Sequence, residues 1–247
     1  MQLPLTQIFQ QYRSQAIAIE SEAELNEQIT QWQIGTPRPT LVIVGGAGGI
    51  ADEDCETLQQ LFIDCVAPWA EENGLAVVDG GTDAGIMRFI GVARDTIQGN
   101  FPLIGVVAEG TVNLPERPGT NPYAAELEPH HSHFVLVPGG EWGDESPWLA
   151  RTATAIAAHH PSVTFVINGG NITWQDIQCS IDENRPVVTF VGSGRTADLL
   201  AETMRGNAQD ERAEKILKQG KVHAISMHTS PTELKTLLAD LFHTALS

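Results

Sequence analysis

The chain has 247 residues, is 42% hydrophobic, and carries a formal net charge of −17. This charge argues against nucleic acid or an anionic membrane as a partner, because both would repel it. The three cysteines form no CxxC pair, which argues against a disulfide framework or a zinc ribbon. No apolar run approaches the ~20 residues that span a bilayer, and no signal pattern opens the chain. We therefore expect a soluble, cytoplasmic protein that needs neither a metal nor a cofactor.

Residues 1–39 are predicted to form an N-terminal helical extension. Spaced apolar residues run through 2–20, and Ser21 is placed to cap a helix over 22–33. Gly35-Thr-Pro-Arg-Pro39 then breaks the chain. Such an extension could provide the contact of a homo-oligomer.

Residues 40–247 are predicted to form a single domain of alternating strands and helices. The strand candidates are short Val- and Ile-rich runs without polar alternation, which is typical of strands buried on both faces. They lie at 40–45, 75–79, 103–107, 133–137, 162–167, 186–191 and 222–227. The helix candidates lie at 53–73, 84–98, 147–159, 173–183, 195–205, 208–219 and 231–245. The order predicts an α/β, Rossmann-like fold, a doubly wound and mainly parallel sheet of about seven strands with helices on both faces.

Five of these strands end in closely spaced glycines. In a parallel sheet the five turns share one edge, where open α/β sheets bind ligands and where glycine turns that lead into helices suit phosphate. The turn residues that we expect at a ligand are Gly45, Gly46, Ala47, Gly48, Gly80, Gly81, Thr82, Gly85, Gly139, Gly140, Gly169, Gly170, Asn171, Gly192, Ser193 and Gly194. Backbone N–H groups of 46–48 and 81–83 are expected to help bind the anion.

The first glycine turn matches G-x-G-x-x-A from Gly46, the local fingerprint of a dinucleotide site. That fingerprint expects an acidic residue ~20 positions further on. The acid that ends the next strand, Asp79, lies well beyond this spacing. The pattern therefore argues against a conventional NAD dehydrogenase.

The turn that ends in Arg195 carries the strongest physical argument for phosphate. Arg195 opens a predicted helix, where a cation is unfavourable to the helix dipole. An anion that bridges its guanidinium and the free N–H groups would reverse that penalty. The alternative is an ion pair between Arg195 and Asp198.

Aromatic and histidine residues flank the fourth predicted strand. Trp142, in the turn after it, could stack on a base, whereas Trp148 at the start of the next helix suits the core. His130, His131 and His133 precede the strand, but no Cys or Asp pair stands near them to complete a metal site. A structural or ligand-contact role is favoured, and His133 is counted among the ligand contacts.

Residues 108–132 contain several prolines and glycines and show no periodicity. A stretch of this length without regular structure is uncommon in a compact domain and is often functional. Because it follows a strand, it should rise from the glycine edge. A lid over the ligand and a solvated excursion both fit this pattern.

Five segments in order resemble the SLOG superfamily, and within it the LSDAT branch that prokaryotic proteins share with the cytoplasmic N-terminal region of TRPM channels. The segments are Gly45-Gly-Ala47, Gly80-Gly-Thr-Asp-Ala-Gly-Ile-Met87, Leu127-Glu-Pro-His-His-Ser-His-Phe-Val-Leu-Val137, Gly169-Gly-Asn171 and Gly192-Ser-Gly-Arg-Thr-Ala-Asp198. The resemblance implies a Rossmann-like domain that recognises a nucleotide derivative, ADP-ribose-like or NAD-related. It places ligand contacts at Gly46, Ala47, Trp142, Arg151 and Arg195.

The wider superfamily includes LOG enzymes, which cleave the N-glycosidic bond of nucleotides and carry a motif resembling Pro-Gly-Gly-x-Gly-Thr-x-x-Glu. This chain starts that motif at Pro138 but has Ser146 in the place of the catalytic glutamate, with Glu145 one residue early. We therefore expect a binding or sensing protein. A nucleotide N-glycosidase or NAD hydrolase that uses Glu145 or Asp83 is the alternative, and an oligomeric scaffold with a vestigial site is a third hypothesis.

Overall fold

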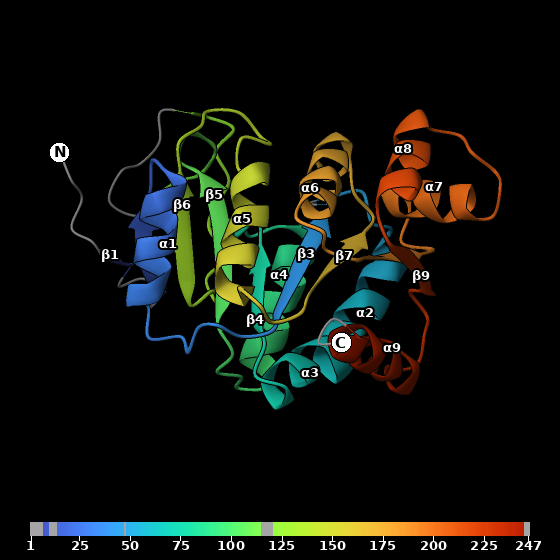
Figure 1. Cartoon of the computed structure of the whole chain (residues 1–247), viewed down its shortest axis with the longest axis horizontal. Helices are drawn as coiled ribbons and strands as arrows, with labels where there is room; N and C mark the ends of the chain where they lie inside the picture. The colour runs from blue at the N-terminus through green and yellow to red at the C-terminus, as the bar shows by residue number, and fades with distance from the viewer. Residues whose placement is uncertain (1–6, 10–13, 47, 115–120, 245–247) are drawn as a thin grey trace.

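The computed structural model describes residues 7–9, 14–46, 48–114 and 121–244. Nine strands form one sheet in the order β1-β2-β6-β5-β4-β3-β7-β8-β9 (Figure 1). The strands are β1 (Gln7–Phe9), β2 (Ser14–Ala18), β3 (Thr40–Gly45), β4 (Ala76–Asp79), β5 (Leu103–Ala108), β6 (His133–Val137), β7 (Ser162–Ile167), β8 (Val187–Val191) and β9 (Val222–Ser226). Only the pair β1–β2 is antiparallel among these strands, so the sheet is almost wholly parallel.

Helices cover both faces of the sheet, as a doubly wound fold requires. They are α1 (Glu22–Gln31), α2 (Asp52–Leu61), the π-helix η1 (Phe62–Val66), α3 (Ala67–Glu72), α4 (Gly85–Thr96), the 3-10 turn η2 (Glu109–Thr111), α5 (Ser146–Ala157), α6 (Asn171–Asp182), α7 (Arg195–Met204), α8 (Glu211–Gln219) and α9 (Pro231–Thr244). Because side chains alternate along a strand, Val42 and Val44 pack with α1 and α5–α8, whereas Leu41 and Ile43 pack with α2–α4 and α9. The predicted α/β architecture is confirmed.

The N-terminal segment is not wholly helical, as the prediction for residues 1–39 had it. Residues 14–18 form a strand, β2, which pairs in parallel with β6 so that Ile17 lies beside Val135. The apolar residues of this segment cover the edge that β6 would otherwise leave open, and Ile17 is buried. The helical extension is therefore wrong here, and the sheet has nine strands rather than about seven. Only α1 follows the prediction, with Ser21 Oγ accepting a hydrogen bond from the Glu24 N–H at 3.3 Å.

The predicted long helix at 53–73 is three consecutive segments, α2, η1 and α3. Pro68 stands in the first turn of α3 and has no N–H to donate to the carbonyl of Asp64 four residues earlier. The backbone widens into a π-helix where that bond is missing. Asn73 ends α3, in agreement with the expected Asn73–Gly74 stop.

The strand order reverses direction beside β3. From β3 the chain builds β4, β5 and β6 on one side, and then returns to add β7, β8 and β9 on the other. Such a switch point leaves a crevice at the carboxyl ends of the two central strands, and ligands of open α/β sheets bind there. In this chain that crevice lies between the turns after β3 and β7.

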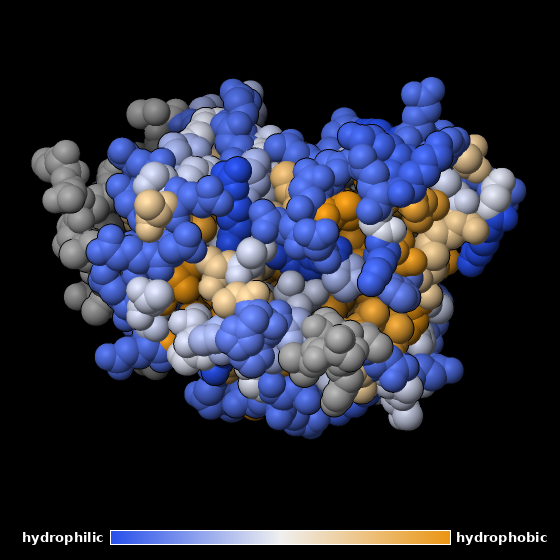
Figure 2. All heavy atoms as spheres, viewed as in Figure 1, coloured by the Kyte–Doolittle hydropathy of each residue, from blue (hydrophilic) through white to orange (hydrophobic). Residues whose placement is uncertain are grey.

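One face of the molecule combines a hydrophilic surface with a local apolar region. Figure 2 shows hydrophobic atoms over β7–β9, between α8 and α9. The outer strand of this region, β9, is half-exposed, and its Val222 and Ile225 pack only partly into the core. Among the described residues, no helix has both the length and the apolarity to cross a bilayer.

Candidate functional site

A cavity of about 530 Å³ opens at the carboxyl edge of the sheet, at the switch point between β3 and β7. All five turns that follow the glycine-ending strands contribute to its wall. The predicted ligand residues that line it are Gly45, Gly46, Gly48, Gly80, Thr82, Trp142, Gly170, Asn171 and Arg195, and the catalytic candidate Glu145 lines it as well. Apolar side chains, among them Val44, Met87 and Leu149, form the floor beneath these polar groups.

Asn168 ties three of the turns together. It follows β7 in a left-handed conformation with φ +56°. Its Nδ2 donates to the Ser193 carbonyl at 2.7 Å and to the Gly49 carbonyl at 3.3 Å, while its Oδ1 accepts from the Gly169 N–H at 2.8 Å. One buried amide therefore sets the relative position of the turns after β3, β7 and β8.

Arg195 stands at the start of α7 and lines the cavity with an exposed side chain. Its Nη1 donates to the Gly48 carbonyl at 3.3 Å, and it forms no ion pair with a carboxylate among the described residues. Asp198 instead accepts from the N–H groups of Gly192 at 2.6 Å and Gly194 at 3.1 Å. The alternative of an Arg195–Asp198 ion pair is therefore wrong, and the guanidinium is available to an anion.

The first turn of α6 forms the neighbouring wall. The helix begins at Asn171, two residues before its predicted start, because Thr173 Oγ1 accepts from the Gly170 N–H at 3.1 Å and orders this turn. Gly170, Asn171 and Thr173 all line the cavity. The N–H groups at a helix start are without helical partners and attract anions. Arg195 and this helix end therefore form one electropositive side of the cavity.

Other backbone donors that the sequence suggested are already engaged. The Gly46 N–H donates to the Ile167 carbonyl at 3.1 Å, and the Asp83 N–H to the Glu126 carbonyl at 2.8 Å. The Gly81 N–H donates to Asp79 Oδ1 at 2.7 Å. The expectation that these three amides bind the anion is wrong, because the turns use them internally.

Two carboxyl groups lie on another side of the cavity, Glu145 at the start of α5 and Asp176 in α6. Ser146 Oγ donates to Asp176 Oδ1 at 2.5 Å, which joins the two helices. Burial, together with the charge of Glu145, raises the pKa of Asp176 to about 7 despite that hydrogen bond. Burial likewise raises the pKa of Glu145. The cavity wall thus carries both a cationic group and weakly acidic groups.

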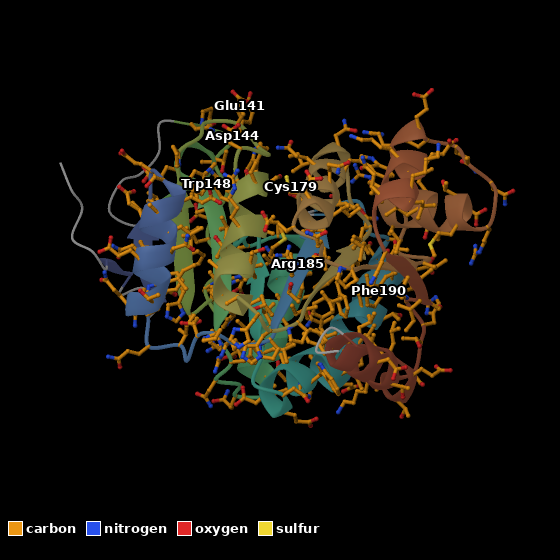
Figure 3. All side chains as sticks on the ribbon, in the orientation of Figure 1. Glu141, Asp144, Trp148, Cys179, Arg185 and Phe190 are labelled. Carbon is orange, nitrogen blue, oxygen red and sulfur yellow. The ribbon has the colours of Figure 1, made fainter. Side chains whose placement is uncertain are left out.

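Arg185 holds α5 against β7 and against α6, the helix that carries Asp176. Its Nη2 donates to the Ala150 carbonyl at 3.0 Å and to Thr154 Oγ1 at 2.9 Å, and its Nε donates to Ser162 Oγ at 3.0 Å. Figure 3 shows Arg185 between α5 and the β7 side of the sheet. This buried guanidinium thereby fixes the spacing on which the Ser146–Asp176 contact depends.

The comparison with known proteins places the chain in a family. A family model described as "SLOG in TRPM, prokaryote" matches residues 38–236. The chain belongs to this LSDAT_prok family. The resemblance drawn from the glycine turns is confirmed. Membership of this family indicates a nucleotide-related role.

Relatives of this LSDAT_prok chain include long channel proteins. "Transient receptor potential cation channel subfamily M member 2" of Mus musculus is 27% identical over 208 residues, covering 69% of this chain and 14% of the channel. The "Transient receptor potential cation channel subfamily M member-like 2" of Nematostella vectensis is 26% identical over 231 residues, covering 77% of this chain and 15% of that channel. The chain therefore spans about a seventh of the length of these channels. An X-ray structure of the structural-genomics target TM1055 has a TM-score of 0.52 at 20% identity, covering 82% of this chain and 99% of that one, and it shows the same fold.

Three residues that were predicted to lie in the site, His133, Arg151 and Asp83, have side chains away from the cavity. His133 stands at the amino end of β6, the opposite edge of the sheet, with its ring 4.6 Å from that of Trp32. Arg151 faces α1, where its Nε lies 3.3 Å from Glu22 Oε1. Asp83 pairs with the Arg88 Nε at 2.6 Å. The predicted contacts of these residues with a ligand in this cavity are therefore not supported by their positions.

The remaining predicted residues belong to the same turns but are not among the residues that line the cavity. These are Gly81, Gly85, Gly139, Gly140, Gly169, Gly192, Ser193 and Gly194, whereas Ala47 lies outside the described residues. Gly81, for example, has φ +63°, and a Cβ there would meet the Gly105 Cα at 2.8 Å. Asp144, shown with Glu141 in Figure 3, orders the loop after β6 by accepting from the Gly140 and Glu141 N–H groups at 3.0 Å each.

The histidines before β6 belong to a buried ionic network. His131 Nε2 lies 2.8 Å from Asp79 Oδ1, and its Nδ1 lies 2.7 Å from Glu128 Oε2. Although burial lowers it, the pKa of His131 is raised to about 9 by these two carboxylates. His130 Nδ1 contacts Glu128 Oε1 at 2.6 Å. Both histidines thus have structural roles.

The described residues of the segment 108–132 contribute to the wall, and they form the 3-10 turn η2 and isolated bridges. Val112 bridges Ala125, Thr82 bridges Leu127, and Ala125 lines the cavity. Residues 115–120 lie outside the described part. The lid stays a prediction.

Proposed function

We propose that the cavity binds a nucleotide derivative, ADP-ribose-like or NAD-related, and that the protein acts as a binding or sensing module. The observation that carries the proposal is the guanidinium of Arg195 beside the first turn of α6, which donates to the Gly48 carbonyl but forms no ion pair with any described carboxylate. Together they offer a planar cation and free helix N–H groups to the same space, the combination that suits phosphate. The chain as a whole is strongly acidic, with a net charge of −17, so a local cationic side of a cavity points to a small anion rather than to nucleic acid.

The rest of the cavity suits the uncharged part of a nucleotide. Trp142 stands on its wall with 44% of its surface exposed, although a large aromatic side chain normally buries more. Its indole offers a stacking face for a base. Apolar Val44, Met87 and Leu149 extend the surface on which a sugar or base could lie. A cavity of about 530 Å³ is in the range of small-molecule sites.

Replacement of Arg195 tests this proposal. Calorimetric titration of ADP-ribose, NAD and AMP should show binding to the wild-type protein, and Arg195→Ala should weaken it about thirtyfold, because a charge-assisted contact to phosphate contributes on the order of 2 kcal/mol. Arg205→Ala is the matched control, since Arg205 follows the other end of α7 and pairs with Glu202. It should leave the affinity unchanged. Wild-type protein that binds none of the three compounds would refute the proposal and favour the scaffold hypothesis.

A second candidate function is hydrolysis of an N-glycosidic bond. Glu145 favours it, because a carboxyl group in the cavity wall could stabilise an oxocarbenium-like centre. Asp83, the other candidate, pairs with Arg88 outside the cavity. Incubation with NAD and AMP followed by chromatography distinguishes turnover from binding. Free nicotinamide or adenine, released by wild type and not by Glu145→Gln, would establish the enzyme in place of the sensor.

A further inference from the structure

Asp176 places a buried carboxyl group in the wall of the cavity. It lies in α6, is 8% exposed, and lines the cavity. Its Oδ1 accepts the hydrogen bond from Ser146, whereas its Oδ2 has no hydrogen-bond partner among the described residues. Oδ2 is not fully buried, because it is not one of the buried polar atoms that lack a hydrogen bond among the described residues. One carboxyl oxygen is therefore held by Ser146, and the other is open to the cavity.

The surroundings of Asp176 keep its carboxyl group neutral more readily than an ordinary aspartate. Burial and the charge of Glu145 raise its pKa to about 7, and the hydrogen bond from Ser146 acts in the opposite direction. No histidine is among the described residues that line this cavity, so none of these residues brings an imidazole that would titrate in the same range. The elements packed around Asp176 carry several other charged or titratable groups. They are Glu145 at the start of α5 and Arg151 within it, Cys179 and Asp182 of α6, Arg195, Asp198 and Glu202 of α7, and Glu211, Arg212, Glu214, Lys215 and Lys218 of α8.

We propose that Asp176 enters the ligand site as a neutral acid, whose Oδ2 hydroxyl donates a hydrogen bond to an uncharged oxygen of the bound nucleotide derivative. Ser146 is the positioning residue, because its hydroxyl donates to Oδ1 and leaves the carboxyl proton on Oδ2. A neutral acid is a donor that an ionised carboxylate cannot be.

This inference rests on the proposed function and names the ligand class more closely. Arg195 takes the anion, while Asp176 takes a hydroxyl or carbonyl oxygen. A second anionic group beside Asp176 would meet Glu145 and an Asp176 that loses its proton. The site therefore selects a nucleotide derivative that has an anionic group for Arg195 and uncharged oxygen atoms, such as those of a sugar, for Asp176.

The test is the pH dependence of ADP-ribose affinity, measured by calorimetry between about pH 6 and about pH 8. A single proton with a pKa near 7 makes wild-type affinity fall roughly tenfold over this range, because the fraction of protein that can donate falls by that factor. Asp176→Asn, whose amide donates at every pH, should keep the same affinity at both ends. Ser146→Ala removes a hydrogen bond that lowers the pKa of Asp176, so the midpoint of the affinity change should move to higher pH.

Asp182→Asn is the matched control, since Asp182 is an exposed aspartate at the end of the same helix. It should keep the wild-type pH dependence. Wild-type affinity that does not change with pH overturns this inference and leaves the proposed function standing. If the ADP-ribose affinity of Asp176→Asn still falls with rising pH, the proton belongs to another group, and this inference is also overturned. Wild-type protein that binds no ADP-ribose at any of these pH values defeats both proposals.

Discussion

At the scale of single residues, contact with the Asn168 side chain, and not only approach of a ligand, accounts for a glycine at position 46. A Cβ at Gly46 would lie 2.5 Å from Asn168 Oδ1, closer than real atoms approach. Position 46 therefore has to be glycine so that the Asn168 amide can lie against this turn and donate to the carbonyls of Gly49 and Ser193. Close backbone approach is what glycine allows, and here the approaching group is part of the protein.

Asn168→Ala should lower both stability and ADP-ribose affinity. The alanine removes hydrogen bonds to two turns and tolerates φ +56° poorly, so we expect a loss of about 2–3 kcal/mol in the free energy of unfolding. Urea denaturation measures this loss. Asn184→Ala is the control, because Asn184 has a similar φ of +58° but is exposed and lies outside the cavity. Equal effects of the two substitutions would show that the backbone conformation, and not the amide contacts, matters.

At the scale of elements, the site depends on how two helices start and how they are held. α6 begins early enough to place its first turn in the cavity, and α5 begins with Glu145 and Ser146 beside it. Arg185 bridges the two, because it donates to Ala150 and Thr154 of α5 and its Nη1 donates to Ser180 Oγ of α6 at 3.5 Å, and Ser146 reaches Asp176. The acidic side of the cavity is therefore a product of the α5–α6 contact.

The segment 108–132 supplies the element-scale prediction. Ala125 lines the cavity, and the Asn113 N–H donates to its carbonyl at 2.8 Å, so this segment is joined to the wall. If it closes over a ligand, saturating ADP-ribose should slow its cleavage by thermolysin several-fold, as followed by mass spectrometry, because cleavage of a segment tracks the population of its open form. The exposed turn at 206–209, outside the cavity wall, is the internal control and should be cut at the same rate. Unchanged cleavage within 108–132 would count against the lid.

At the scale of the whole molecule, one buried ionic network links the end of β4 to the approach to β6. The protonated His131 lies between Asp79 and Glu128, all three of them buried. Although burial raises it, the pKa of Glu128 is held below its ordinary value by hydrogen bonds from His131 and His130. The network is thus most favourable when His131 is protonated and Glu128 is ionised.

Stability should therefore fall on both sides of neutral pH. The pKa of His131 is about 9 in the folded protein against an ordinary 6.5, so its contribution is complete below about 6.5 and is lost as the pH rises through about 9. Glu128 contributes above its ordinary pKa, and this contribution is lost on acidification. We expect the alkaline loss to be on the order of 1–3 kcal/mol in urea unfolding. His131→Gln should remove this alkaline decline, whereas His228→Gln, at an exposed position, should preserve it. An unaltered decline in His131→Gln would contradict the assignment.

The sequence by itself determined the doubly wound α/β fold, the positions of seven of the strands, the family, and the edge of the sheet that carries the cavity. Those features follow from short-range patterns, namely apolar runs, glycine turns and alternating elements. Tertiary structure decided the rest, because the remaining contacts join residues far apart in the chain. The segment 14–18 is a strand because it pairs with β6. Asp176 lies in the cavity wall, where it accepts a hydrogen bond from Ser146 of a different helix. The same packing turned His133 and Arg151 away from the cavity, since strand polarity and helix facing depend on neighbours that no local pattern names.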